Sequence, residues 1–366
     1  MTFSEKLNLS NSLTNPFIKR EFLDALNESN SACADTGWDP LHIKISQGTT
    51  GAVLPLYLKT HSMGEYVFDH VWANAYHRHG LEYYPKLVTA IPFTPSMGPR
   101  IINSDQLLPI NYSELINKIT EVAATRRSSS WHLLFGNTDV VSCFESPELL
   151  TRKGVQYHWY NRGYSDFDDF LNTLTSKKRK MIRKERESIS RQQIAITLFT
   201  GKKIDHSIWE LFYRLYERTY AKRNGTRGYL TKKFFDLISN SMSDQLLMAV
   251  AMRHKEPIAC ALYFYDSECL YGRYWGSTSE YNHLHFELCY YAGIEFAITN
   301  KLLRFDAGAQ GEHKIIRGFE PVKTTSLHWI RHPEFRRAIS SFLEQEEAHV
   351  VEHVERARQL LPFKTK

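Results

Sequence analysis

Residues 271–322 carry the pattern that decides the fold, and they read YGRYWGSTSEYNHLHFELCYYAGIEFAITNKLLRFDAGAQGEHKIIRGFEPV. The aromatic-rich residues at 269–275 predict a strand, which the segment at 276–282 ends. Apolar side chains at 284–298 follow two adjacent helical stripes, which predicts a helix that is buried on more than one side. Residues 302–306 then predict a short second strand, and a loop with two glycines follows it.

The order of strand, helix, strand and glycine-bearing loop predicts a βαβ unit. Its crossover favours a parallel pair of strands, with a ligand crevice beyond their carboxyl ends. The end of the second strand and the loop after it place five polar side chains at this crevice: Asp306, Gln310, Glu312, His313 and Lys314. We therefore expect the functional site in this segment.

Six segments of the chain extend over roughly residues 64–322: VFDHVWANAYHRHGLEYYPKL, PFTPSMGPRI, SKKRKMIRKER, LYGRYWG, LHFELCYY and FDAGAQGEHKIIRGFEP. In combination they resemble the FemAB-like family of bacterial peptidoglycan biosynthesis or recognition proteins, within the GNAT acyltransferase superfamily. The resemblance implies an α/β fold of two tandem GNAT-like domains, each a mixed sheet flanked by helices. It also implies transfer of an aminoacyl or acyl group from a carrier, aminoacyl-tRNA or acyl-CoA, to an amine. A peptidoglycan precursor is the candidate acceptor, and no tightly bound cofactor is expected.

Length and internal similarity favour two domains. The chain has 366 residues, which suits two domains of about 150 to 200 residues better than one. Two expected strand pairs, at 42–58 and 246–265, each follow a helix-rich segment, which favours diverged copies of one α/β unit. We predict an N-terminal GNAT-like domain at 1–163 and a C-terminal one at 164–366. The second has a basic linking helix and a long C-terminal helix that starts at His332.

Composition predicts a soluble, cytoplasmic protein. The five cysteines form no CxxC pair, which fits a reducing compartment better than a disulfide framework. The sequence has neither a run of eighteen apolar residues nor an apolar leader, so no transmembrane segment is expected. His77 and His79 point to different faces of their expected helix, and no metal site is predicted.

The most charged stretch lies between Ser176 and Arg191, where eight Lys or Arg residues stand against two Glu. A solvated helix face normally mixes the two signs, so an anion-binding surface and a solvated face are equally good interpretations. The candidate polyanion-binding residues are Lys177, Lys178, Arg179, Lys180, Arg183 and Lys184. Their candidate partners are tRNA, a coenzyme phosphate or an anionic lipid headgroup. Ile182 and Ile189 allow the opposite side of this helix to pack on the core.

Acyl transfer to an amine requires a proton acceptor, donors for the developing oxyanion and an anchor for negative charge. Asp306 and Glu287 are the candidate bases, because burial in apolar surroundings raises the proton affinity of a carboxylate. Lys314 is the third candidate catalytic residue and would hold negative charge. The expected substrate-binding residues are Tyr271, Arg273, Tyr274, Trp275, Gly308, Gln310, Gly311, Glu312, His313 and Arg317. A structural alternative stays open, in which Asp306 caps its loop and Glu287 pairs with Arg273.

The residues leave open which donor is used and whether the protein catalyses a transfer at all. In family members that use acetyl-CoA, a glycine-rich turn at the start of this helix holds the pyrophosphate. Here no glycine lies between Ser277 and Glu287, which disfavours acetyl-CoA and leaves aminoacyl-tRNA slightly ahead of acyl-CoA. The same absence fits a binding protein without turnover, which would recognise a cell-wall precursor or nucleic acid on a degenerate GNAT fold. No Walker-type loop is present, so an ATP-driven ligase is not expected.

Overall fold

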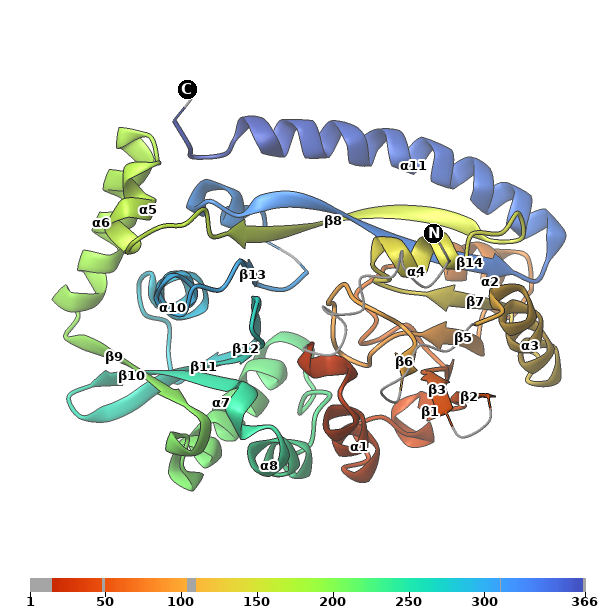
Figure 1. Cartoon of the computed structure of the whole chain (residues 1–366), viewed down its shortest axis with the longest axis horizontal. Helices are drawn as coiled ribbons and strands as arrows, with labels where there is room; N and C mark the ends of the chain where they lie inside the picture. The colour runs from red at the N-terminus through yellow and green to blue at the C-terminus, as the bar shows by residue number, and fades with distance from the viewer. Residues whose placement is uncertain (1–14, 48–49, 104–109, 310, 365–366) are drawn as a thin grey trace. The chain divides into compact units, whose positions relative to one another are not determined.

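The computed structural model describes residues 15–47, 50–103, 110–309 and 311–364 (Figure 1). By its internal contacts the chain divides into two compact units. Unit 1 contains Met1–Val155 and Lys323–His353, and unit 2 contains Gln156–Val322 and Val354–Lys366.

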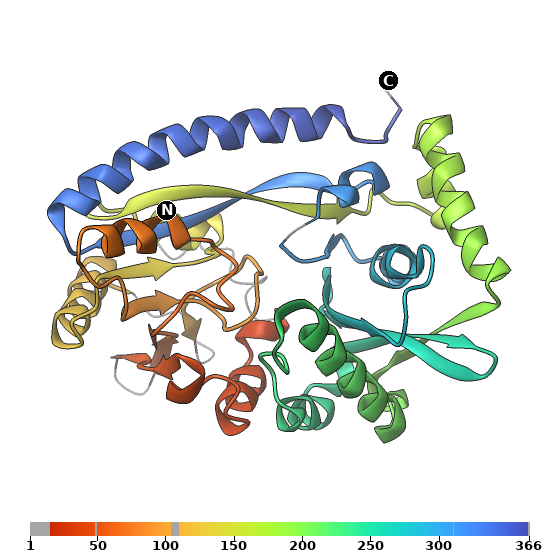
Figure 2. The same cartoon turned by 180° about the vertical axis from the view of Figure 1, so that it is seen from behind.

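Three long elements contribute residues to both units: β8 (Leu150–Tyr160), β14 (Glu320–Ile330) and α11 (Pro333–Gln359) (Figure 2). The residues of β8 in unit 2 pair with β13 (Arg304–Asp306), whereas β14 pairs with β7 (Ser130–Leu133) in unit 1. Each half of the sequence therefore supplies a strand to the sheet of the other half. The predicted boundary at 163 and 164 lies near the first crossing, but a single cut cannot describe the return of the chain to unit 1.

Unit 1 is built on a mixed sheet. Its further elements are α1 (Arg20–Glu28), β1 (Trp38–Pro40), β2 (Ile43–Gln47), β3 (Thr50–Leu54), β4 (Tyr57–Lys59), α2 (His70–Arg78), β5 (Lys86–Thr89), β6 (Ile102–Asn103), α3 (Tyr112–Thr125) and α4 (Thr138–Cys143), with 3-10 turns at Pro16–Ile18 and Ala34–Thr36. The strand order is β1-β4-β5-β7-β14, and β2, β3 and β6 form a separate three-stranded sheet. Strands β5 and β7 are parallel and are connected through α3, while β4 and β14 flank them in antiparallel pairings.

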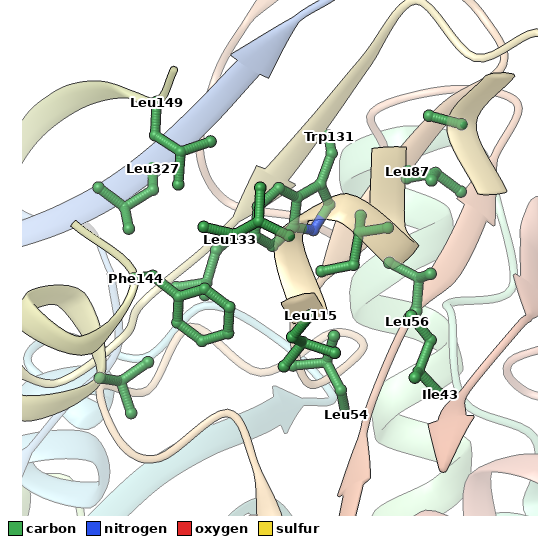
Figure 3. Close-up of a cluster of buried hydrophobic side chains, with 14 residues drawn as sticks. Ile43, Leu54, Leu56, Leu87, Leu115, Trp131, Leu133, Phe144, Leu149 and Leu327 are labelled. Carbon is green, nitrogen blue, oxygen red and sulfur yellow. The ribbon is translucent and has the colours of Figure 1, made fainter. Parts of the chain in front are cut away.

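Helix α3 supplies much of the apolar core of unit 1 (Figure 3). Its buried residues Leu115 and Ile116 lie four and three positions before Ile119, so all three share one face of the helix. They pack with Trp131 and Leu133 of β7. The other buried members of this cluster are Ile43, Leu54, Leu56, Leu87, Ala123, Val140, Phe144, Leu149 and Leu327.

A buried ion cluster fixes the segment before α2 to β5. Lys86 Nζ donates to Glu65 Oε2 at 2.7 Å and also to the carboxylate of Asp69. The side chains of all three are at most 2% exposed. Tyr83 donates from its hydroxyl to Asp69 Oδ2 at 2.6 Å. Because an uncompensated charge inside a protein is strongly unfavourable, each of these charged residues depends on the others.

Unit 2 contains the segment from which the fold was predicted. Its further elements are α5 (Phe167–Asn172), α6 (Ser176–Arg191), β9 (Ile194–Thr200), α7 (His206–Asn224), α8 (Lys232–Ser241), β10 (Leu246–Arg253), β11 (Glu256–Tyr265), β12 (Cys269–Ser277), α9 (Leu284–Phe286), the π-helical turn η7 (Glu287–Tyr291), α10 (Ala292–Thr299) and the 3-10 segment η8 (Glu312–Arg317), with 3-10 turns at Gly201–Lys203 and Ser243–Gln245. The strand order is β8-β13-β12-β11-β10-β9. Strands β12 and β13 are parallel, and the pairs β9–β10, β10–β11, β11–β12 and β8–β13 are antiparallel.

The two units repeat one strand arrangement, which confirms the predicted α/β fold of two similar halves. In each, a parallel pair is connected through helix and flanked by antiparallel strands: β4-β5-β7-β14 in unit 1 and β11-β12-β13-β8 in unit 2. Both parallel pairs have three residue pairs. The predicted correspondence between the strand pairs at 42–58 and 246–265 is wrong, because β2 and β3 belong to the separate small sheet.

Of the helices in the described parts of the chain, none combines the length and the apolarity that crossing a bilayer requires. These parts also contain no cluster of three or more His, Cys, Asp or Glu side chains that could hold a metal ion. All five cysteines are free thiols.

Candidate functional site

Strands β12 and β13 separate at the carboxyl end of their parallel pairing. The register joins Cys269 to Arg304, Leu270 to Phe305 and Tyr271 to Asp306, and there β13 ends. Strand β12 continues to Ser277 and stays paired with β11 only. The separation exposes the edge of β12, and a cavity of about 100 Å³ lies beside it.

This cavity is lined by two strands, one helical segment and the first residue after β13. The lining residues are Ala261, Leu262, Tyr263, Gly272, Arg273, Tyr274, Trp275, His285, Cys289, Tyr290 and Ala307. Of the predicted site residues, Arg273, Tyr274 and Trp275 are among them. A volume of about 100 Å³ is below the 300–1,000 Å³ of typical ligand pockets, so it suits a reacting group and not a whole substrate.

Asp306 forms a buried ion pair with Arg273. Arg273 donates from Nη2 to Asp306 Oδ2 at 2.9 Å and from Nη1 to Oδ1 at 3.3 Å, and both side chains are 2% exposed. The backbone N–H of Gly308 donates to Oδ1 at 2.9 Å. Burial acts to raise the pKa of Asp306, but Arg273, His158 and these hydrogen bonds hold it well below its usual range. Asp306 is therefore a fixed negative charge at neutral pH. The hydrogen bond from Gly308 matches the half of the structural alternative in which Asp306 caps its loop.

Lys314 is a buried ammonium beside the loop that follows β13. It is 2% exposed, and its Nζ donates to the carbonyl oxygen of Gly308 at 2.8 Å. Gly308 has a φ of +87°, a backbone conformation that favours glycine. Burial lowers the pKa of Lys314 to about 8, although Asp306 acts to raise it. A positive charge with a partly neutral form near physiological pH is thus held at the loop that begins with Ala307, a lining residue of the cavity.

Glu287 and Arg317 point away from this cavity and toward α6. Arg186 donates to Glu287 Oε1 at 3.0 Å and to Glu295 Oε2 at 2.8 Å. Glu287 therefore pairs with Arg186, not with Arg273 as the structural alternative had it. Burial raises the pKa of Glu287, and Arg186 opposes this rise. Arg317 is 2% exposed and donates to Glu185 Oε1 at 2.7 Å.

A tyrosine and a histidine near the cavity were not predicted as a pair. Tyr290 lines the cavity, and its hydroxyl lies 2.7 Å from Nε2 of His313. Partial burial of its ring lowers the pKa of His313, and the positive charges of Arg317 and Lys314 lower it further. Gly311 has a φ of +113°, and a Cβ there would lie 2.8 Å from the His313 ring, so glycine makes room for this histidine.

The π-helical turn explains why the sequence did not reveal the histidine and tyrosine of the cavity wall. His285 and Tyr290 both line the cavity, although residues five apart on a regular α-helix differ by about 140° in direction. The turn η7 adds a residue to one helical turn and brings the two onto one side. Turns of this kind are frequent at functional sites.

Within the described part of the chain, the remaining predicted substrate-binding residues do not line the cavity. Tyr271 is 2% exposed, and its hydroxyl donates to Asp266 Oδ2 at 3.1 Å. Glu312 is exposed at the start of η8. Gln310 lies outside the described residues.

The basic helix α6 presents most of its charge outward. Ile182 and Ile189 are 0% and 4% exposed, so they pack against the core as expected. Arg183 pairs with Asp168 at 2.9 Å, with both side chains more than half exposed. Among the described residues, no acidic partner is found for the other five candidates: Lys177, Lys178, Arg179, Lys180 and Lys184.

Comparisons with known proteins agree with this architecture. The model of the FemAB-like family, described as peptidoglycan biosynthesis/recognition, matches residues 4–365. The crystal structure of FemX has a TM-score of 0.51 at 12% identity, covering 93% of this chain and 98% of that one. L-PGS from Bacillus licheniformis has a TM-score of 0.51 at 11% identity, covering 90% and 97%. A conserved protein of unknown function from Bacteroides thetaiotaomicron has a TM-score of 0.50 at 10% identity, covering 90% and 98%. A search of curated protein sequences found no match.

Proposed function

Since the chain belongs to the FemAB-like family of peptidoglycan biosynthesis or recognition proteins, we propose that it is an aminoacyl or N-acyltransferase. It would move an aminoacyl or acyl group from a carrier to an amine, and a peptidoglycan precursor is the candidate acceptor. The observation that carries this proposal is the separated β12–β13 pair with a cavity at the split. Arg273 lines this cavity and pairs with buried Asp306, and buried Lys314 donates to the loop after β13. We infer that the acyl carbonyl enters this cavity.

Lys314 is proposed to stabilise the developing oxyanion. The amine nitrogen attacks the ester or thioester carbonyl, a C–N bond forms, and the carrier leaves with the electron pair of the broken C–O or C–S bond. Negative charge builds on the carbonyl oxygen during the attack, and a buried cation acts strongly on it because water is excluded. Asp306 would keep Arg273 in place and raise the pKa of Lys314, which maintains the protonated form.

Tyr290 and His313 are proposed as the proton acceptor. The carboxylates are less suited, because Asp306 is held ionised by Arg273 and Glu287 is bound to Arg186 away from the cavity. The amine proton would pass to the Tyr290 oxygen while the phenolic proton moves to Nε2 of His313, which becomes an imidazolium. Because the pKa of His313 is lowered, its imidazole is neutral at pH 7 and ready to accept this proton. His313 is exposed, so the proton can leave to solvent.

Product analysis tests the function directly. The full chain would be incubated with charged tRNAs, acyl-CoAs and candidate amines, including peptidoglycan precursor peptides, and the amines examined by mass spectrometry. A mass gain from one donor class identifies the carrier, and the proposal favours aminoacyl-tRNA. Saturable binding of a precursor or nucleic acid with no mass gain from any donor would instead support the binding protein without turnover.

The pH dependence of transfer tests the proton acceptor. In the wild-type chain we expect transfer to rise with pH as His313 loses its proton, at a pKa below 6.5. His313→Gln should lower transfer by about 10² and abolish this rise, because proton acceptance contributes at least that factor. His206→Gln, at an 82% exposed site of α7, is the matched control and should leave the profile unchanged. If folded His313→Gln shows the same rise of transfer with pH as the wild type, a group other than His313 accepts the proton.

The salt dependence of tRNA binding tests α6. We propose that the helix binds the donor's phosphates, and replacing Lys177, Arg179, Lys180 and Arg183 by Gln should flatten the slope of log K against log salt. The slope should change by up to roughly 3 to 3.6, because each of the four lost phosphate contacts contributes about 0.7 to 0.9. Lys202→Gln/Lys203→Gln, on exposed residues of the same unit, is the control. If the wild type and both variants have equal slopes, the basic residues of α6 form a solvated face and do not bind phosphates.

A further inference from the structure

Unit 1 contains a second cavity that the proposed transfer site does not involve. Its volume is about 440 Å³, which lies within the range of small-molecule pockets. One face of the paired strands β8 and β14 forms one side, and α4 forms another. Every lining residue belongs to unit 1.

Two lysines make this cavity positively charged. Thr151 and Lys153 on β8, and Lys323 and Thr325 on β14, are two residues apart, so each pair points to one face of its strand. Lys153 Nζ lies 3.3 Å from Thr325 Oγ1. In the described chain, neither lysine has an acidic partner. The acidic residue of the lining is Glu145, which is exposed, so the lining carries a net charge of one positive unit.

The charges fit a phosphate better than a carboxylate. A phosphate monoester carries about 1.5 to 2 negative charges at pH 7, so two ammonium groups attract it more strongly than a carboxylate with one charge, and the exposed Glu145 offsets part of this attraction. Arginine holds both carboxylate and phosphate with its two-pronged guanidinium, whereas lysine binds phosphate as a point charge. The lining contains no arginine. The hydroxyls of Thr151 and Thr325 can supply further hydrogen bonds to phosphate oxygens.

Apolar side chains provide a place for the rest of such a ligand. Met97, Val141, Leu149 and Leu327 line the same cavity, and Leu149 and Leu327 are 8% and 2% exposed. We propose that the cavity binds a small phosphate monoester, with its phosphate between Lys153 and Lys323 and its organic part against these apolar residues. This site is independent of the transfer chemistry proposed for unit 2.

Calorimetric titration of the full chain with three probes tests this site. Phenyl phosphate has both a phosphate and an apolar organic part. Inorganic phosphate lacks the organic part, and benzoate has a carboxylate in place of the phosphate. We expect saturable binding of one phenyl phosphate per chain, with weaker binding of the other two probes. Lys153→Met/Lys323→Met should weaken phenyl phosphate binding roughly tenfold or more, because hydrogen bonds to charged groups contribute that much. Lys118→Met, at an exposed position of α3 in the same unit, should bind as the wild type does.

A second variant separates the cavity from general surface charge. Ser142→Trp adds bulk at an exposed lining position of α4 and removes no charge, so it should weaken phenyl phosphate binding while both lysines stay in place. Equal affinity for benzoate and phenyl phosphate would overturn the phosphate assignment. Absence of saturable binding to the folded wild-type chain would overturn the site. Binding that survives the double lysine variant, but is lost when the four α6 residues are replaced by Gln, would place the anion on α6.

Discussion

Asp306→Asn is expected to lower the free energy of unfolding by about 3–5 kcal/mol, because removing one partner of a buried ion pair leaves the other charge uncompensated. The remaining charge is the guanidinium of Arg273, of which 2% is exposed. Asparagine has nearly the same shape, so the change removes charge with little loss of volume. Chemical denaturation of both proteins, followed by circular dichroism, gives the difference directly.

The control for Asp306→Asn is a pair of the same kind at the surface of unit 2. Arg162 and Glu320 are 2.5 Å apart, with 48% and 24% of their side chains exposed. Glu320→Gln should cost at most about 1 kcal/mol. Adding Arg273→Met to Asp306→Asn should recover part of the loss, because the unpaired cation is then gone. If Asp306→Asn is as stable as Glu320→Gln, the buried pair contributes nothing beyond a surface pair.

The pH dependence of this effect has a defined sign. The pKa of Asp306 in the folded chain lies below 3.8, its value in an unfolded chain. The pair therefore contributes its full stability above pH 3.8, and that contribution is lost as the pH falls below this value toward the folded-state pKa. The difference between wild type and Asp306→Asn should shrink in the same range.

The core of unit 2 could be predicted from the sequence because its signals are local. The aromatic strand, the apolar helix and the short second strand each follow from side-chain periodicity, and the handedness of crossovers predicts their parallel pairing. The structure has this pairing between 269–271 and 304–306, with the cavity at the predicted end. The predicted site residues Arg273, Tyr274 and Trp275 line that cavity, but their roles stay predictions.

The exchange of strands between the two halves could not be predicted in the same way. Strand β8 pairs with β13 across about 145 residues of sequence, and β14 pairs with β7 across nearly 200. Alternation within a strand reports which face is buried and carries no information on its partner. The predicted domain boundary therefore cuts the chain once in sequence order, whereas each unit combines distant segments whose strands pair.

Part of the cavity wall could not be predicted, because the prediction used the period of a regular α-helix throughout this segment. Glu287 was predicted at the cavity, but its place on the helix turns it toward Arg186 of α6. His285 and Tyr290 come together only through the π-helical turn, which has no recognised sequence signature in this segment. In unit 1, the ion cluster around Lys86 joins residues 17 and 21 positions away, a spacing that no helix or strand period marks.

Lys314→Met is expected to reduce transfer by about 10² to 10³ while the folded chain keeps its stability. The first effect follows from the proposed role, because removing one group that stabilises an oxyanion has this magnitude. The second follows from the pKa of Lys314, which burial lowers from 10.5 to about 8. At a pH where this buried lysine is charged, its burial costs free energy, and the folded state is less stable for that reason. Wild-type stability should therefore rise with pH between about 8 and 10.5, by at most about 3 kcal/mol.

Single-turnover transfer and denaturation, measured together from pH 6 to 10, separate the possible roles of Lys314. If its charge holds the oxyanion, wild-type transfer should fall as the pH rises through about 8, the pKa of Lys314, and Lys314→Arg should lack this fall because arginine stays charged. Lys202→Met, at an exposed position of unit 2, should match the wild type in both measurements. Transfer that instead rises through pH 8 would make Lys314 the proton acceptor. Loss of stability together with transfer in Lys314→Met would make the lysine a structural support of the loop, since its Nζ donates to Gly308 at 2.8 Å.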